Sequence, residues 1–116
     1  MTFKFKNKYS FEERVKSSTK IIDKYPNRIP IICEKDKSSD LGELKNNRFL
    51  VAKDLTFGQF MYVIRKNLNL TPEKALYLTI NNIMPPTSLI INSVYNEYKS
   101  EDGFLYVIYY GENTFG

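Results

Sequence analysis

The run FLYVIYY, residues 104–110, is the most apolar stretch of this sequence, and it constrains the fold more than any other feature. Its aromatic and β-branched residues are typical of a strand. Six residues of mainly polar character, GENTFG, follow it as residues 111–116. We therefore predict a packed domain whose last element is a strand, followed by a short flexible tail.

Length and composition favour one globular domain. The chain has 116 residues, of which 42% are hydrophobic and 26% are charged, and this suits a single modest core. No apolar run approaches the ~18 residues that a membrane-spanning helix needs, and the N-terminus lacks the pattern of a secretory signal. We expect a soluble, intracellular protein.

The cysteine and histidine content excludes several chemistries. Cys33 is the single cysteine and the chain has no histidine, so we expect no disulfide framework, no metal site and no histidine-based catalytic residues. Cys33 lies in an apolar run, where cysteine behaves as a small buried hydrophobe. We expect that the protein is not an enzyme.

The positive charge is concentrated near the N-terminus. Residues 1–28 contain eight lysines and arginines against three acidic residues, and the whole chain has a net charge of +4. A basic face of this kind can meet acidic peptides, anionic lipids or phosphate backbones, and it can also be a solvated helix surface. Nucleic-acid binding would rest on charge alone, because the aromatic and basic strand signature of an RNA-recognition domain is missing. We expect no nucleic-acid partner.

Two capping boxes predict helix starts. Ser10 to Glu13 fits the first, and the apolar stripe behind it continues to Pro26 (Phe11, Val15, Ser18, Ile22, Tyr25). Ile21 lies about 80° from Phe11 around this helix, so it either lines a groove or closes the edge of the core. Thr56 to Gln59 fits the second box, followed by another apolar stripe (Phe57, Phe60, Met61, Ile64, Leu68).

Four strands are predicted around the second helix. RIPIICEK, residues 28–35, and RFLVAKDL, residues 48–55, can pair as a hairpin with a long loop. Pro30 has no N–H to donate, which favours an edge strand or a strand start. ALYLTINN, residues 75–82, is a third strand, a helix begins near Thr87 or Ser88 and reaches Tyr98, and the last strand spans 104–110. This order predicts an α+β or α/β sheet and fits a ubiquitin-like core with an extra N-terminal helix.

Five segments, in this order and spacing, resemble one family nearly end to end: NRIPIICEK, DLTFGQFMYVIRK, PEKALYL, MPPTS and DGFLYVIYYGENTFG. They are similar to the autophagy ubiquitin-like modifiers, the family of the yeast autophagy-related protein eight and its animal relative GABARAP. The resemblance implies an α+β fold, the ubiquitin-like β-grasp with an additional N-terminal helical segment. It divides the chain into a basic helical segment 1–26, a ubiquitin-like domain 27–110 and a flexible conjugation tail 111–116.

The resemblance implies a chemistry for the tail. Gly116 matches the glycine whose carboxylate is activated with ATP by an activating enzyme, passed to a conjugating enzyme and joined to phosphatidylethanolamine. Phe115 and Thr114 are the expected contacts of these enzymes, and a deconjugating cysteine protease is a further expected partner. No cofactor of its own is implied. Glycine suits this role physically because a residue without Cβ can enter a narrow catalytic channel. The protein would be cytoplasmic, and on autophagosomal or related membranes once it carries the lipid.

The resemblance also implies binding of cargo receptors and adaptors. Relatives add a short peptide, with an aromatic residue followed three positions later by an aliphatic one, as a strand along the segment that matches RFLVAKDL. The aromatic residue would enter a pocket formed by Ile21, Pro30, Ile32, Arg48, Leu50 and Phe104. The aliphatic residue would enter a pocket formed by Phe49, Val51, Leu55, Phe60 and Val63. Arg28 and Arg48 would meet acidic residues beside the anchors. The resemblance places Pro30 in a strand inside the sheet, against the edge position.

Some positions depart from the family pattern. Ser17 stands where relatives often have an acid, Asn46 and Asn47 stand where basic residues are common, and Ala52 replaces a usual proline. We therefore expect weaker attraction for acidic flanks. Thr79 replaces an aromatic residue, which puts a second binding surface there in doubt.

Two matters stay open at this level. The alternative function is an unconjugated ubiquitin-fold module that binds peptides or acidic surfaces such as tubulin tails. Phe3, Phe5 and the lysines around them could form an ordered helix, an oligomerising arm or a mobile end.

Overall fold

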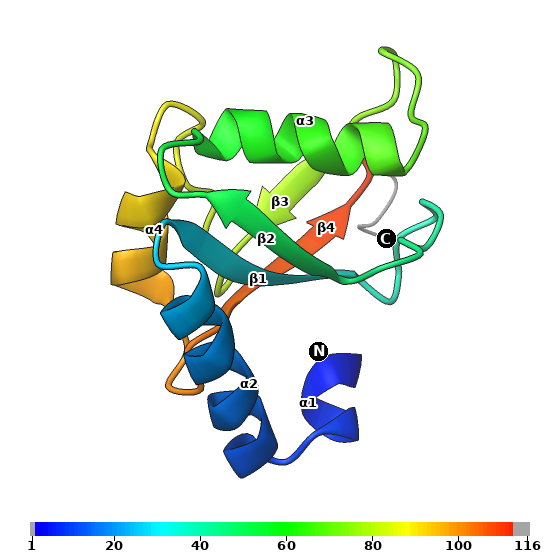
Figure 1. Cartoon of the computed structure of the whole chain (residues 1–116). Coiled ribbons are helices and arrows are strands. Elements are labelled where there is room, and N and C mark those ends of the chain that lie inside the picture. The colour runs from blue at the N-terminus through cyan, green and yellow to red at the C-terminus, as the bar shows by residue number, and fades with distance from the viewer. Residues whose placement is uncertain (1, 113–116) are drawn as a thin grey trace.

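The computed structural model describes residues 2–112 of the chain, and this part contains eight helices and strands (Figure 1). In chain order they are α1 (Lys4–Lys8), α2 (Phe11–Lys24), β1 (Arg28–Lys35), β2 (Arg48–Ala52), α3 (Phe57–Asn67), β3 (Tyr77–Thr79), α4 (Ile91–Tyr98) and β4 (Leu105–Tyr110). Thr114, Phe115 and Gly116, the predicted residues of the conjugation tail, lie outside the described residues.

The strands form one mixed sheet in the order β2-β1-β4-β3. β1 is antiparallel to β2 and parallel to β4, and β3 is antiparallel to β4. α3 lies across one face of the sheet, and α1 and α2 lie on the opposite side (Figure 1). The predicted hairpin of β1 and β2 is confirmed, and so is the prediction of an α+β fold.

Each face of the sheet has its own apolar cluster. Ile29, Ile31 and Cys33 of β1 belong to the main core with the buried side chains of α3 and α4. Ile32, which alternates with them, belongs to a second cluster with Phe5, Phe104 and Tyr106 on the side of α1 and α2. Because β1 is buried on both faces, its sequence is a continuous apolar run and does not alternate with polar residues.

Both predicted capping boxes are confirmed. The hydroxyl of Ser10 accepts a hydrogen bond from the Glu13 N–H at 3.1 Å, and the Glu13 carboxylate accepts from the Ser10 N–H at 2.8 Å. Thr56 and Gln59 make the same reciprocal pair, at 3.1 and 2.9 Å. A cap of this kind contributes about 1 kcal/mol to a helix, so local sequence fixes both helix starts.

The edge position considered for Pro30 is wrong, and the interior strand implied by the resemblance is confirmed. β1 has β2 on one side and β4 on the other. Pro30 pairs with Leu50 of β2, whereas pairing with β4 begins one residue later, at Ile31. The proline therefore lies at the end of the strand where only one neighbour is paired, and this explains why a residue without an N–H is tolerated there.

Two strands are shorter than predicted, and one helix begins later than predicted. β2 ends at Ala52 and β3 spans three residues, because Asn81 and Asn82 turn the chain with φ of 51° and 64°. α4 begins at Ile91 and not near Thr87. Thr87 is engaged elsewhere, since its carbonyl oxygen accepts a hydrogen bond from the Gly58 N–H at 3.0 Å.

The helix α2 buries less of its apolar stripe than its sequence predicts. Phe11 and Tyr25, at the two ends of the stripe, are 48% and 39% exposed. Ser18 is the buried residue of the helix, and its hydroxyl donates a hydrogen bond to the Asp102 carbonyl oxygen. α2 therefore contacts the rest of the domain along its middle, and its ends extend beyond the contact.

Candidate functional site

The strand β2 is the edge strand on which the predicted peptide site depends. Within residues 2–112 it pairs with β1 alone. Bonded and non-bonded pairs alternate in an antiparallel ladder. The Pro30–Leu50 pair has to be a non-bonded one because proline lacks an N–H, and the hydrogen bond from the Cys33 N–H to the Asn47 oxygen, at 2.8 Å, fits the same alternation. The N–H and C=O of Arg48 and Leu50 therefore point outward, to the open edge.

The residues predicted for the aromatic pocket gather on the side of α1 and α2. Pro30 and Ile32 of β1 pair with Leu50 and Arg48 of β2. Ile21 of α2 packs against the cluster that holds Ile32 and Phe104. Ile32 and Phe104 are 0% and 2% exposed, whereas Leu50 and Ile21 are half-buried. The fold thus brings these six residues together, and a ligand can reach the half-buried pair and the exposed Arg48.

The residues predicted for the aliphatic pocket gather on the opposite side, next to α3. The rings of Phe49 and Phe60 meet edge to face, with centroids 5.8 Å apart. Val51 belongs to the main core, Leu55 packs against it, and Val63 lies on α3 one turn after Phe60. Phe49, Leu55 and Val63 are half-buried. The two sets therefore lie on opposite faces of the same open strand.

This separation has a consequence for any strand added along β2. Successive side chains of a strand point to opposite faces, so two residues three positions apart face opposite ways. One such anchor would face the set around Leu50, and the other would face the set around Phe49. The geometry fits a ligand with two apolar anchors at that spacing.

Arg48 connects β2 to the N-terminal helix. Its guanidinium donates a hydrogen bond to the Tyr9 hydroxyl at 2.9 Å and lies 4.9 Å from the Phe5 ring centroid and 5.2 Å from that of Tyr9. Arg28, at the other end of the pairing, is exposed, with a guanidinium nitrogen 3.4 Å from the Leu50 carbonyl oxygen. The two arginines therefore lie at opposite ends of the open edge.

Sequence reasoning missed Phe5 and Tyr9 as neighbours of this site. Phe5 is 4% exposed, and its ring meets that of Phe104 at 5.1 Å. The carboxylate of Glu34 accepts hydrogen bonds from the N–H groups of Lys4 and Phe5, at 2.7 and 3.0 Å, and so holds the first turn of α1 against β1. The segment that the sequence left undecided is an ordered helix. The signal in the sequence was the alternation of aromatic residues and lysines in the first nine positions.

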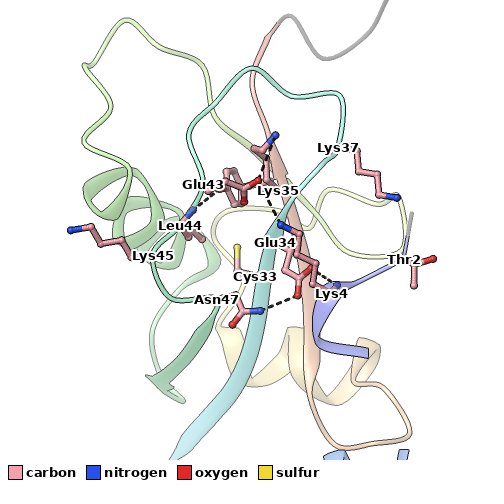
Figure 2. Close-up of a pocket in the computed structure, with 11 residues that line it drawn as sticks. Thr2, Lys4, Cys33, Glu34, Lys35, Lys37, Glu43, Leu44, Lys45 and Asn47 are labelled. Carbon is pink, nitrogen blue, oxygen red and sulfur yellow. Dashed lines mark hydrogen bonds and ion pairs between the residues drawn. The ribbon is translucent and has the colours of Figure 1, made fainter. Parts of the chain in front are cut away.

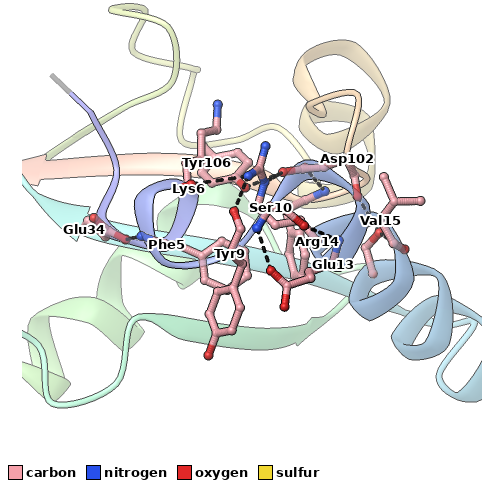
Figure 3. Close-up of polar contacts among 12 residues, drawn as sticks. Phe5, Lys6, Tyr9, Ser10, Glu13, Arg14, Val15, Glu34, Asp102 and Tyr106 are labelled. Atoms are coloured by element: carbon pink, nitrogen blue, oxygen red, sulfur yellow. Dashed lines mark hydrogen bonds and ion pairs between the residues drawn. The ribbon is translucent and has the colours of Figure 1, made fainter.

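A buried polar network fixes α1 and α2 over the sheet (Figure 3). The Asp102 carboxylate, 1% exposed, accepts hydrogen bonds from Arg14 at 2.8 Å, from the Phe104 N–H at 3.0 Å and from the Tyr106 hydroxyl. Arg14 also donates to the Tyr9 carbonyl oxygen at 2.6 Å. Burial alone would raise the pKa of Asp102, but the donors of Tyr106, Phe104 and Arg14 hold this pKa below its usual range.

Cys33 is fully buried, as expected for a structural residue. Burial, and secondarily the negative charge of Glu34, raises the pKa of the Cys33 thiol far above its ordinary value. A thiol held protonated in this way is a poor nucleophile. Within residues 2–112, no group of three or more histidine, cysteine, aspartate or glutamate residues is placed to hold a metal ion. No helix in that part of the chain is long and apolar enough to cross a membrane.

The fold and the open edge define the class of protein. A four-stranded mixed sheet with α3 across one face and extra helices on the other is a ubiquitin-like β-grasp with an N-terminal helical addition. Comparison with known proteins narrows the class. Residues 13–116 match the family described as "Autophagy protein Atg8 ubiquitin like". The chain belongs to this Atg8 family of autophagy ubiquitin-like modifiers.

Relatives with this fold are similar over almost their whole length. Autophagy-related protein 8 of Schizosaccharomyces pombe is 53% identical over 116 residues, which is 100% of this chain and 96% of that protein. The Saccharomyces cerevisiae protein of the same name is 52% identical, over 97% of this chain and 96% of its own. The crystal structure of Trypanosoma brucei ATG8 superposes with a TM-score of 0.94 at 46% identity and covers 100% of both chains.

A second solved relative carries a ligand. Plasmodium falciparum Atg8, in complex with a Plasmodium falciparum Atg3 peptide, superposes with a TM-score of 0.86 at 35% identity. The match covers 96% of this chain and 100% of that one. That relative therefore binds a peptide on the same fold.

Proposed function

We propose that this chain is conjugated through Gly116 to phosphatidylethanolamine and then acts on autophagosomal membranes as an adaptor for peptides with an aromatic residue and an aliphatic residue three positions apart. The observation that carries the adaptor role is the pair of apolar sets on opposite faces of β2, beside an open edge. Their separation fits the alternation of side chains along an added strand. Residues 27–110 would form the ubiquitin-like domain that holds this site, and α2 would contribute Ile21 to it.

The peptide would extend the sheet beyond β2. The outward N–H and C=O groups of Leu50 and the C=O of Arg48 would supply the backbone hydrogen bonds, and the two apolar sets would supply selectivity for the side chains. The Arg48 N–H donates to the Asn46 side-chain oxygen at 3.1 Å and would have to exchange this partner for the peptide. Arg28 and Arg48 would attract acidic residues beside the anchors. Asn46 and Asn47 add no charge, so acidic flanks would contribute less here than in a relative with lysines at those positions. The Atg3 peptide bound by the Plasmodium relative supports peptide recognition by this fold.

The conjugation role rests on the family match and on the position of Gly111, the first residue of the tail. The family match extends through residue 116. Gly111 is buried, and its N–H donates to the Ser39 hydroxyl at 3.2 Å, which holds the chain in place one residue before the end of the described part. An activating enzyme would use ATP to activate the Gly116 carboxylate, and a conjugating enzyme would transfer this carboxyl group to the lipid amine. Thr114 and Phe115 would contact these enzymes. A cysteine protease would later separate the protein from the lipid. The chain itself would be a substrate with no cofactor of its own.

Membrane attachment would then come from the lipid. Phosphatidylethanolamine has two acyl chains, and each buried methylene contributes ~0.8 kcal/mol, so that two chains hold a protein stably where one is marginal. The protein would be cytoplasmic before conjugation and bound to autophagosomal or related membranes afterwards.

The test is a reconstituted conjugation. The chain is incubated with its activating and conjugating enzymes, ATP and liposomes that contain phosphatidylethanolamine, and the intact mass is measured. We expect a mass gain of one phospholipid, and no gain in a variant that lacks Gly116. If enzymes that act on a relative leave this chain unmodified, the conjugation role is refuted.

One observation favours a second candidate function. The lysines of α2, Lys16, Lys20 and Lys24, are all exposed, and such a basic helix can bind acidic surfaces such as tubulin tails without conjugation. Binding of that kind would weaken with salt and would be indifferent to removal of Gly116. A pull-down with tubulin at low and high salt, with and without Gly116, distinguishes the two functions.

A further inference from the structure

A pocket of about 310 Å³ lies at the far end of β1 from the peptide site (Figure 2). The loop between β1 and β2, the start of α1 and Tyr109 of β4 form its walls. Its apolar part includes Leu44 and Tyr109, and its polar part is dominated by lysines (Lys4, Lys35, Lys37, Lys45). The proposed functions use none of these side chains.

The charge of the pocket is positive after its internal pairs are considered. Four lysines line it against two glutamates, Glu34 and Glu43, which leaves a net charge of +2. The Glu34 carboxylate accepts hydrogen bonds from the N–H groups of Lys4 and Phe5 and from the amide of Asn47 at 3.0 Å. Glu43 lies 3.9 Å from the Lys4 ammonium and 4.0 Å from that of Lys35.

Two further ammonium groups are free to bind an anion. Lys37 and Lys45 are exposed and have no acidic partner within residues 2–112. Figure 2 shows them on opposite sides of β1. Two cations that flank a pocket attract an anion into it, and no carboxylate of residues 2–112 forms an ion pair with either of them.

The loop that forms the pocket contacts Gly111, the first residue of the tail. Lys35 donates a hydrogen bond to the Ser39 carbonyl oxygen at 2.9 Å, and the hydroxyl of the same serine accepts from the Gly111 N–H at 3.2 Å. Leu41 closes the other side of Gly111, since a Cβ placed on this glycine would lie 3.1 Å from Leu41. The loop that forms the pocket therefore also holds the last described residues of the chain.

Tyr109 makes this loop rigid. Its hydroxyl donates to the Gly42 carbonyl oxygen at 2.7 Å and accepts from the Leu44 N–H at 3.1 Å. A preorganised pocket loses little conformational freedom when a ligand binds, which favours binding by a few well-placed charges.

We propose that this pocket binds the phosphate of an anionic phospholipid headgroup in the membrane to which the tail is attached, attracted by the charges of Lys37 and Lys45, which flank the pocket on opposite sides of β1 (Figure 2). The inference rests on the proposed conjugation, because it is the lipid on the tail that brings this end of the sheet to a bilayer. A phosphate matches the lysines, which bind it as point charges. The contact would orient the domain with the loop of residues 36–47 toward the lipid and leave the open edge of β2 accessible to peptides.

The test uses the unconjugated full chain, so that it does not depend on the enzymes. Binding to vesicles of phosphatidylcholine, with or without phosphatidic acid, is measured by flotation, and amide NMR shifts are recorded for Lys35 and Leu44. The pocket variant carries Lys37→Gln and Lys45→Gln. The matched control carries Lys66→Gln and Lys74→Gln, which remove two exposed charges elsewhere. Each lysine near an anionic surface contributes about fivefold to affinity, so we expect the pocket variant to lose about 25-fold and the control to lose less than threefold.

Each other outcome overturns the proposal. Equal losses in the two variants would mean that net charge alone attracts the protein to the vesicles. If inorganic phosphate shifts the same amides as strongly as the vesicles do, the ligand is a soluble phosphate and not a headgroup. If a glutamate-rich peptide binds with the same dependence on Lys37 and Lys45, the site is for acidic protein segments. A conjugation assay of the pocket variant separates the two proposals, because Gly116 should still receive its lipid when the pocket is disabled.

Discussion

Replacement of Asp102 by asparagine tests what holds α1 and α2 on the sheet. The carboxylate is buried and accepts from Arg14, Tyr106 and the Phe104 N–H. Asp102→Asn puts an N–H group where an acceptor is needed and deprives Arg14 of its counter-charge. Removing one partner of a buried ion pair costs about 3–5 kcal/mol. We expect the lower end, about 3 kcal/mol, because the Arg14 side chain keeps 12% exposure and the bond from Phe104 can survive.

Urea denaturation followed by circular dichroism measures this effect. A loss of about 3 kcal/mol in the free energy of unfolding corresponds to a decrease in Tm of about 12 °C for a domain of this size. Glu101→Gln is the matched control, since Glu101 is exposed and adjacent and its replacement removes the same charge. An unchanged urea midpoint in Asp102→Asn would refute the idea that this network holds the helices in place.

The same variant has a signature in its pH dependence. Because the pKa of Asp102 is lower in the folded state than in the unfolded chain, its ionised form stabilises the fold at pH values above about 4. This contribution is lost as the pH falls through the lowered folded-state pKa. We therefore expect the free energy of unfolding to fall less steeply below pH about 4 in Asp102→Asn than in the unaltered protein. Parallel curves for the two proteins would contradict the assignment.

Three further outcomes are expected. Leu50→Ala should weaken a peptide with the two anchors about tenfold, because it removes one wall of the aromatic set, whereas Tyr62→Ala on the exposed face of α3 should not; equal effects in isothermal calorimetry would exclude the site. Cys33 should react with a thiol reagent only as fast as the domain opens, since burial raises its pKa, and rapid labelling of the native protein would contradict this. Gly103→Ala should lower Tm by several degrees, because φ is +91° and the new Cβ would lie 2.4 Å from the Ser18 hydroxyl oxygen; an unchanged melting curve would count against it.

Local chemistry made much of the fold predictable. Ser10 and Thr56 determine helix starts through contacts three residues away, and the strands follow from short apolar runs. The start of α4 was not predictable in this way. Ile91 donates its N–H to the Leu55 carbonyl oxygen at 2.6 Å, so the boundary depends on a distant partner that the sequence does not reveal.

The site was predictable to a similar extent. The resemblance supplied the residues of both apolar sets, and the structure places them on opposite faces of β2. The alternation of aromatic residues and lysines marked the first nine positions, but their place beside the site could not be predicted. Phe5 and Tyr9 reach the site only because Glu34, 29 positions after Phe5, anchors their helix. Whether the chain divides at residues 26 and 110 stays a prediction.

The parallel pairing of β1 with β4 has a consequence for how the protein is made. Ile31 and Leu105 are paired neighbours at the centre of the sheet, yet they lie 74 positions apart in the chain (105 − 31). Such distant pairing slows folding, because the ends of a long loop must meet before the contact stabilises anything. β1 therefore lacks its central partner until the last strand has been synthesised. A nascent chain can form the β1–β2 hairpin and α3 early, but the sheet closes only when the ribosome has released the residues that lead into the tail.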